Sequence, residues 1–182
     1  QFTTESQPER PGQISGLHHL DVASAIMRNT ADLLAEWPNN FNVLLAAIQG
    51  LMSPSQSLRR SFGRIYRVLY RDLRAPGFQF LRDAFETYLH EHWWGFVCKR
   101  NRSLSPDTVA NHPRLTEGTA AREAGTSRAV VRHLVQAELI PGIEGELPSG
   151  RRVRSIHQGD IQRIVALAEG AMSLTEAAEL LA

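Results

Sequence analysis

The chain has 182 residues, of which 42% are hydrophobic and 21% are charged, and its formal net charge is +1. This composition is that of an ordinary globular protein and excludes a disordered chain. No apolar run approaches the roughly 20 residues of a membrane-spanning helix. The single cysteine, Cys98, excludes an internal disulfide and a paired-cysteine zinc site in this chain. We therefore expect a protein of a reducing, cytoplasmic setting.

The positive charge is unevenly distributed along the chain. Residues 56–74 hold six arginines against one aspartate, and residues 99–154 hold ten basic against six acidic side chains. Such concentration is expected of a protein that contacts nucleic acid. Because the chain begins at Gln1 rather than methionine, we also expect it to be part of a longer protein.

The first hundred residues predict a polar tail followed by an α-helical domain. Residues 1–15 contain two prolines and are interpreted as a tail or linker. Residues 16–100 are interpreted as one domain. Apolar spacing and helix-breaking residues predict four helices in it, at about residues 20–37, 39–52, 56–73 and 78–98.

The third predicted helix carries a narrow stripe of arginines, Arg60, Arg64, Arg67 and Arg71. This stripe fits a phosphate backbone or a partner protein. A solvated face paired with acidic neighbours is the other interpretation. The fourth helix carries an apolar stripe, which predicts either the domain core or an aromatic ridge for a partner. Its members are Phe78, Leu81, Phe85, Tyr88, Leu89, His92 and Phe96. His90 and His92 lie two residues apart, which is a poor spacing for metal ligands on a helix.

Residues 101–113 are polar, with two prolines, and are interpreted as a linker. The residues that follow have the order of a helix-turn-helix. Thr116 is a suitable N-cap, and small alanines let a second helix cross closely. Gly125 allows the positive φ of a tight turn, and Ser127 caps the second helix. The second helix then presents predicted DNA-binding residues, which are Thr126, Ser127, Arg128, Ala129, Arg132 and His133.

A basic hairpin and a further helix complete this region. The turn at residues 148–150 precedes an alternating Arg152, Val153 and Arg154, which is typical of a short hairpin. An amphipathic helix then begins near Asp160. The order helix, turn, helix, basic hairpin, helix resembles the winged modules of MerR and excisionase proteins. The resemblance implies that residues 114–170 bind DNA and that Arg151, Arg152 and Arg154 form a wing that contacts phosphates or the minor groove.

The last residues predict the start of a second such unit. Ala177 and Ala178 correspond to Ala120 and Ala121 at a fixed offset along the chain. We therefore interpret residues 171–182 as the beginning of a second helix-turn-helix. The predicted fold class is mainly α: a helical domain followed by a winged helix-turn-helix domain with a small β-hairpin wing.

Two phrases, Ala35 to Phe41 and Ala84 to Gly95, combine with this module to resemble the TniQ/TnsD family of transposon target-selection proteins. The resemblance spans roughly residues 20–170. It implies a non-catalytic bacterial adaptor, associated with the nucleoid, that recognises target DNA or an RNA-guided CRISPR effector complex. The adaptor would recruit an AAA+ ATPase and a transposase. The family carries cysteine-rich zinc motifs in its N-terminal half. We therefore expect no cofactor in this chain and place any zinc in a segment before Gln1.

The sequence leaves two alternatives to an adaptor. A MerR-like transcription regulator is the alternative, but such a protein normally begins with its helix-turn-helix and continues into a coiled coil. A winged scaffold used only for protein contacts is a second alternative. An enzyme is not expected, because the aspartates are scattered and no nucleophile or phosphate-loop motif is present.

Overall fold

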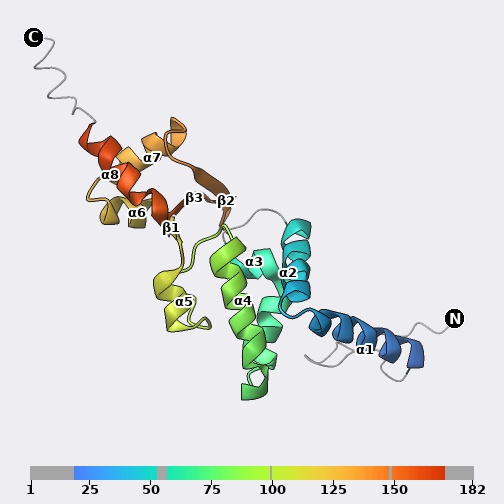
Figure 1. Ribbon diagram of the computed structural model, residues 1–182. Helices are drawn as coiled ribbons and strands as arrows, with labels where there is room; N and C mark the ends of the chain where they lie inside the picture. The colour runs from blue at the N-terminus through green and yellow to red at the C-terminus, as the bar shows by residue number, and fades with distance from the viewer. Residues whose placement is uncertain (1–18, 53–56, 99, 148, 171–182) are drawn as a thin grey trace, which may run out of the picture. The chain divides into compact units, whose positions relative to one another are not determined.

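The computed structural model describes residues 19–52, 57–98, 100–147 and 149–170. The protein is mainly helical, with a small antiparallel sheet (Figure 1). It divides into two compact units. The first consists of Gln1–Ser53 and Leu58–Tyr88, and the second of Pro54–Ser57 and Leu89–Ala182. None of the described helices has the length and apolarity required to cross a membrane.

The first unit is built from helices joined by short breaks. Its elements are α1 (Leu20–Ala35), α2 (Asn39–Leu51), α3 (Leu58–Arg67), a π-helical turn η1 (Val68–Asp72), a 3-10 turn η2 (Pro76–Phe78) and most of α4 (Gln79–His92). These elements confirm the four predicted helices in their order. The first helix ends just before Pro38, as its missing N–H predicts.

Aromatic rings fill much of the core of this unit. Phe62 and Phe85 are fully buried, and their rings meet edge to face at a centroid distance of 5.0 Å. Tyr88 packs against the same Phe62 ring and its hydroxyl hydrogen-bonds Gln49. The predicted stripe of α4 is thus core where it holds Phe85, Tyr88 and Leu89. The two ends of the predicted stripe are not buried, because Phe78 is 41% exposed and His92 is exposed as well.

Two predicted helices differ from the observed ones. The third is broken at Gly63, whose φ of 51° and ψ of −126° lie outside the helical region, so the continuous helix predicted over 56–73 is wrong there. Glycine tolerates this conformation because it has no Cβ. The fourth helix ends at His92 rather than near Cys98. The chain leaves the helix at Trp93, whose buried indole packs against the His112 ring.

The second unit holds four helices among its described residues and a three-stranded sheet. Its elements are α5 (Pro106–Asn111), β1 (Arg114–Thr116), α6 (Glu117–Glu123), α7 (Arg128–Gln136), β2 (Gly142–Glu146), β3 (Arg152–His157), the 3-10 turn η3 (Gln158–Asp160) and α8 (Ile161–Glu169). The linker predicted over residues 101–113 is not what the structure shows. That segment contains α5, and it buries Leu104 and His112. The tail at 1–15 and the second helix-turn-helix predicted at 171–182 lie outside the described residues.

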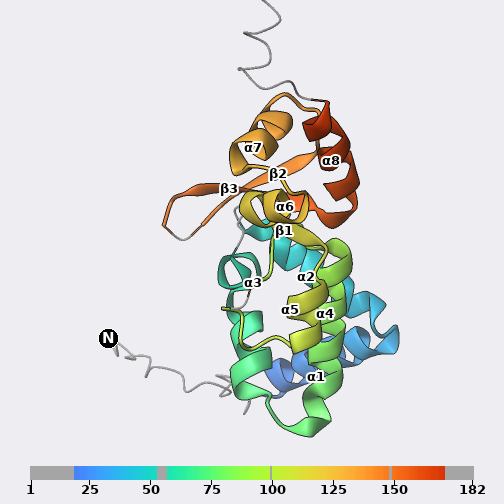
Figure 2. The same ribbon diagram turned by 90° about the vertical axis from the view of Figure 1, so that its left-hand side faces the viewer.

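The sheet has the order β1-β3-β2, and both pairings are antiparallel. The β2–β3 hairpin confirms the predicted one, with Glu144 opposite Arg154 and Glu146 opposite Arg152. It extends beyond the helices of its own unit (Figure 2). The strand β1 was not predicted. It pairs along β3, with Leu115 opposite Ile156, and so connects the start of α6 to the hairpin.

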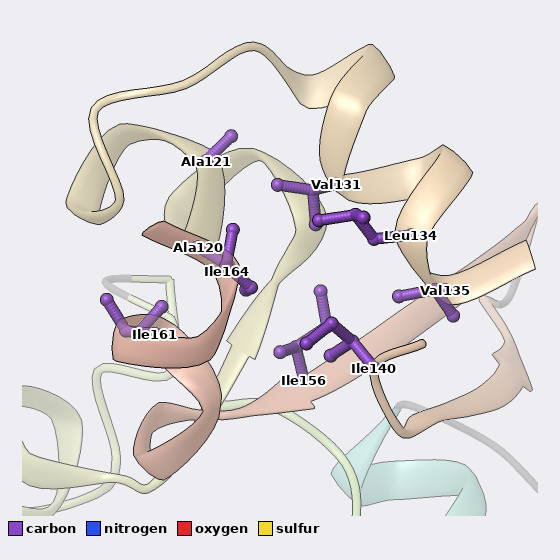
Figure 3. Close-up of a cluster of buried hydrophobic side chains, with 9 residues drawn as sticks. All are labelled: Ala120, Ala121, Val131, Leu134, Val135, Ile140, Ile156, Ile161 and Ile164. Atoms are coloured by element: carbon purple, nitrogen blue, oxygen red, sulfur yellow. The ribbon is translucent and has the colours of Figure 1, made fainter. Parts of the chain in front are cut away.

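The N-caps of α6 and α7 and the glycine of the turn between them lie where the sequence predicted them. The Thr116 hydroxyl accepts a hydrogen bond from the Thr119 N–H, and the Ser127 hydroxyl accepts one from Val130. Gly125 has a φ of 66°. Below the turn, aliphatic side chains from α6, α7, β3, α8 and the segment before β2 point toward one another (Figure 3). These are Ala120, Ala121, Val131, Leu134, Val135, Ile140, Ile156, Ile161 and Ile164.

Candidate nucleic-acid interface

Two of the predicted DNA-binding arginines lie at the beginning of α7. Arg128 is the first residue of the helix, directly after its Ser127 cap. Arg132 follows one turn later, so both side chains lie on the same side of the helix. Their side chains are 46% and 48% exposed, which leaves each of them accessible to a ligand.

These arginines meet a third one, from the hairpin, at a single carboxylate. The Glu117 Oε2 atom accepts hydrogen bonds from Arg128 Nε and Nη2, both at 3.1 Å. Arg132 Nε lies 3.6 Å from the same oxygen, and Arg154 Nη1 lies 3.7 Å from Oε1. Glu117 begins α6, and its side chain is only 6% exposed. We call these four residues the Glu117 cluster.

The location of Glu117 explains why the cluster forms. A carboxylate removed from water is stable only when it is paired with opposite charge. It also lies in the first turn of α6, where the helix dipole favours an anion. Arg128 lies in the first turn of α7, where the same dipole disfavours a cation. The Glu117 carboxylate offsets that disadvantage.

The cluster continues along the hairpin. Arg154 Nη2 lies 3.9 Å from Glu144 Oε2, and Arg152 Nη1 lies 3.8 Å from Glu144 Oε1. The Arg152 side chain is 82% exposed, whereas Arg154 is 25% exposed. Four arginines therefore share two glutamates, and the network keeps a formal excess of positive charge at the junction of α6, α7 and the hairpin.

The other predicted contact residues of this unit fall into two groups. Ala129 and His133 are exposed on α7, and Arg151 is exposed at the start of the second arm of the hairpin. Thr126 and Ser127 lie in the turn, where their roles are structural as well. The Thr126 N–H donates to Ala121 O at 2.9 Å, and Ser127 caps α7.

The arginine stripe of the first unit has a different geometry. Arg60, Arg64, Arg67 and Arg71 are all exposed. Gly63 separates Arg60 from the others, and Arg71 lies in the π-helical turn η1, so the four do not follow one regular helix. Among the described residues, Arg64, Arg67 and Arg71 form no ion pair with an acidic side chain.

A buried histidine anchors the strand that leads into α6. His112 Nδ1 accepts the Arg114 N–H at 3.2 Å, and Nε2 lies 3.2 Å from Leu89 O, which makes the Nε2–H form the one that satisfies both contacts. Desolvation by burial lowers the pKa of His112 to about 4. The imidazole is therefore neutral at physiological pH and supports the backbone before β1. Desolvation also lowers the pKa of Arg114, and the nearby Asp160 carboxylate opposes that effect.

The sequence analysis missed the acidic members of this site. Glu117 follows an N-cap, a position at which acidic residues are common for reasons of helix stability alone. Its sequence position therefore carried no sign of burial or of contact with arginines 11, 15 and 37 residues away. The described residues contain no group of three or more His, Cys, Asp or Glu side chains that could hold a metal ion.

Comparison with known proteins identifies no relative of this chain. No protein-family model, no curated protein and no solved structure matches the chain.

Proposed function

We propose that residues 114–170 form a winged helix-turn-helix that binds double-stranded DNA. The element order β1, α6, turn, α7, β2, β3, α8 supports this proposal, since a short strand before the first helix pairs with β3, one of the two wing strands. So do the capped helices and the Gly125 turn between them. In this arrangement α7 is the recognition helix and the β2–β3 hairpin is the wing.

The observation that carries the proposal is the convergence of arginines from α7 and β3 on one carboxylate. Arg128, Arg132 and Arg154 each have a guanidinium nitrogen within 3.7 Å of a Glu117 oxygen. The recognition helix and the wing therefore share one basic surface rather than two separate ones. A duplex lying on that surface would meet α7 in its major groove and the wing arginines at its phosphates or minor groove.

The test is a selection of binding sites by the full chain from a pool of random duplexes, followed by affinity measurements. We expect an enriched sequence that binds at least about a thousandfold more tightly than a scrambled duplex at near-physiological salt. A winged scaffold used only for protein contacts would enrich no sequence. Equal affinity for all duplexes would also contradict recognition by α7.

We further propose that the chain is a target-site adaptor of a transposition system, with no catalytic step of its own. This proposal depends on the resemblance of residues 20–170 to TniQ/TnsD proteins. Its partners would be target DNA or an RNA-guided effector complex, together with an AAA+ ATPase that brings the transposase. It would act at the bacterial nucleoid.

The adaptor proposal is tested by co-purification of the full chain with an AAA+ ATPase encoded beside it, in the presence and absence of the selected duplex. We expect the ATPase to be retained on the DNA only when the chain is present. A chain that binds its duplex but never retains the ATPase would favour a MerR-like transcription regulator instead.

A further inference from the structure

Glu117 lies beneath the proposed DNA-binding surface rather than on it. Its side chain is 6% exposed, so a duplex would not contact it directly. A carboxylate near this surface weakens the attraction of phosphates, because it subtracts a positive charge. Besides its effect on helix stability, it can therefore aid DNA binding only through the orientation of the arginines that it holds.

The hydrogen bonds of Arg128 show which part of the guanidinium remains available. Nε and Nη2 both donate to Glu117 Oε2 at 3.1 Å, so one edge of the group is fixed. The opposite edge, formed by Nη1 and the second hydrogen of Nη2, has no partner among the described residues. Two parallel N–H groups at that edge match the O6 and N7 acceptors of guanine in the major groove.

Arg132 is held by a looser contact. Only its Nε atom approaches Glu117, at 3.6 Å, and its terminal nitrogens have no partner in the part of the chain that the structure describes. Arg154 connects the same carboxylate to the wing, since its Nη1 faces Glu117 and its Nη2 faces Glu144. One buried carboxylate thus orients the recognition helix and the wing together. Side chains that are already held lose less rotamer freedom on binding.

We propose that Glu117 is a positioning residue that sets the base discrimination of this surface by presenting the outer edge of Arg128 to a guanine. The proposal rests on the proposed DNA-binding function. It separates two contributions of the cluster. The arginines supply the attraction to DNA, whereas Glu117 supplies the geometry that distinguishes one sequence from another.

The test compares Glu117→Gln with Glu123→Gln in the full chain. Glu123 is exposed on the same helix, so the two variants remove the same charge. The measured quantity is the ratio of the dissociation constants for a scrambled and a selected duplex. We expect E117Q to lower this ratio by about tenfold or more, in line with the loss of one bidentate base contact. The scrambled duplex should bind E117Q no more weakly than wild type, and E123Q should keep the wild-type ratio.

A double-variant cycle separates positioning from simple stability. With Arg128→Ala already present, E117Q should lower the ratio little further, because the two residues act through one contact. If E117Q does not fold, as judged by its thermal unfolding, Glu117→Asp replaces it. Asp keeps the charge but withdraws it by one methylene, and we expect the same loss of discrimination.

The outcomes separate the two proposals. A specific wild type whose ratio survives E117Q overturns the positioning role and leaves DNA binding intact. An equal loss of affinity for both duplexes overturns it too, because it shows phosphate contacts or stability alone. A wild type that binds no duplex overturns the proposed function and this inference together.

Discussion

The two arginine groups of this protein are similar in sequence but differ in structure. In the first unit, Arg64, Arg67 and Arg71 lie exposed along a broken helix without acidic partners among the described residues. In the second unit, Arg128, Arg132 and Arg154 come from different elements and share one buried carboxylate. The difference indicates that charge density alone does not identify a surface suited to recognising a nucleic-acid sequence. Fixed orientation requires a partner that holds the charges in place.

The largest expected effect comes from removing the two arginines of the proposed recognition helix. Arg128→Ala combined with Arg132→Ala should weaken binding to a selected duplex about a thousandfold, because two base-edge contacts of about 1–3 kcal/mol each are lost. Binding to a scrambled duplex should fall much less. Fluorescence anisotropy with both duplexes measures the two affinities.

The matched control for this prediction is Arg64→Ala combined with Arg67→Ala, which removes the same charge from the first unit. We expect it to leave the preference for the selected duplex unchanged. If both double variants lose the same affinity for every duplex, the contrast between the two groups is not functional.

The next largest effect is a loss of stability in acid that originates at His112. Its pKa of about 4 in the fold lies below the ordinary value of 6.5, so the unfolded chain binds more protons between these pH values. The contribution of His112 to the free energy of unfolding should therefore be fully present above about pH 6.5. It should fall by about 3 kcal/mol as the pH drops to 4. Denaturant titrations at a series of pH values measure this slope.

The variant His112→Gln isolates this contribution from that of other titrating groups. It has no imidazole to protonate, so its unfolding free energy should depend less steeply on pH between 6.5 and 4 than that of wild type. Identical slopes for the two proteins would remove His112 as the cause.

A smaller effect is expected at two of the positive-φ glycines, Gly63 in the first unit and Gly125 in the second. Gly63 has a φ of 51° and Gly125 a φ of 66°. Alanine at either position should lower the unfolding free energy by about 1–2 kcal/mol, because its Cβ disfavours this region. At Gly63 a Cβ would also lie 3.3 Å from Met52 Cε, whereas the space at Gly125 is open. We therefore expect G63A to be the more destabilised, as measured by chemical denaturation. The reverse order would contradict this ranking.

The smallest effect is expected at the exposed wing. Arg151→Ala combined with Arg152→Ala should weaken binding a few-fold to about tenfold, and equally for all sequences, since these side chains would contact phosphates. The dependence of affinity on salt should become shallower by about two phosphate contacts. A loss confined to the selected duplex would instead assign the wing a role in base recognition.

Local signals determined much of the second unit from the sequence. Thr116 and Ser127 are caps, Gly125 provides the turn, and the hairpin forms where alternation predicted it, because each depends on residues only a few positions apart. The division into units was less predictable. Polarity and prolines over 101–113 suggested a linker, but contacts with Leu89 and Trp93 bury His112 there.

The sequence by itself determined the helical class, the helix-turn-helix signals and the basic residues of α7 and the hairpin. Only the tertiary structure showed that β1 pairs with β3 and that Glu117 is buried beneath three arginines. The physical reason is distance along the chain. Caps and turns are set by neighbours, whereas the environment of a carboxylate depends on which distant elements fold over it. That folding turns a set of basic residues into one oriented surface.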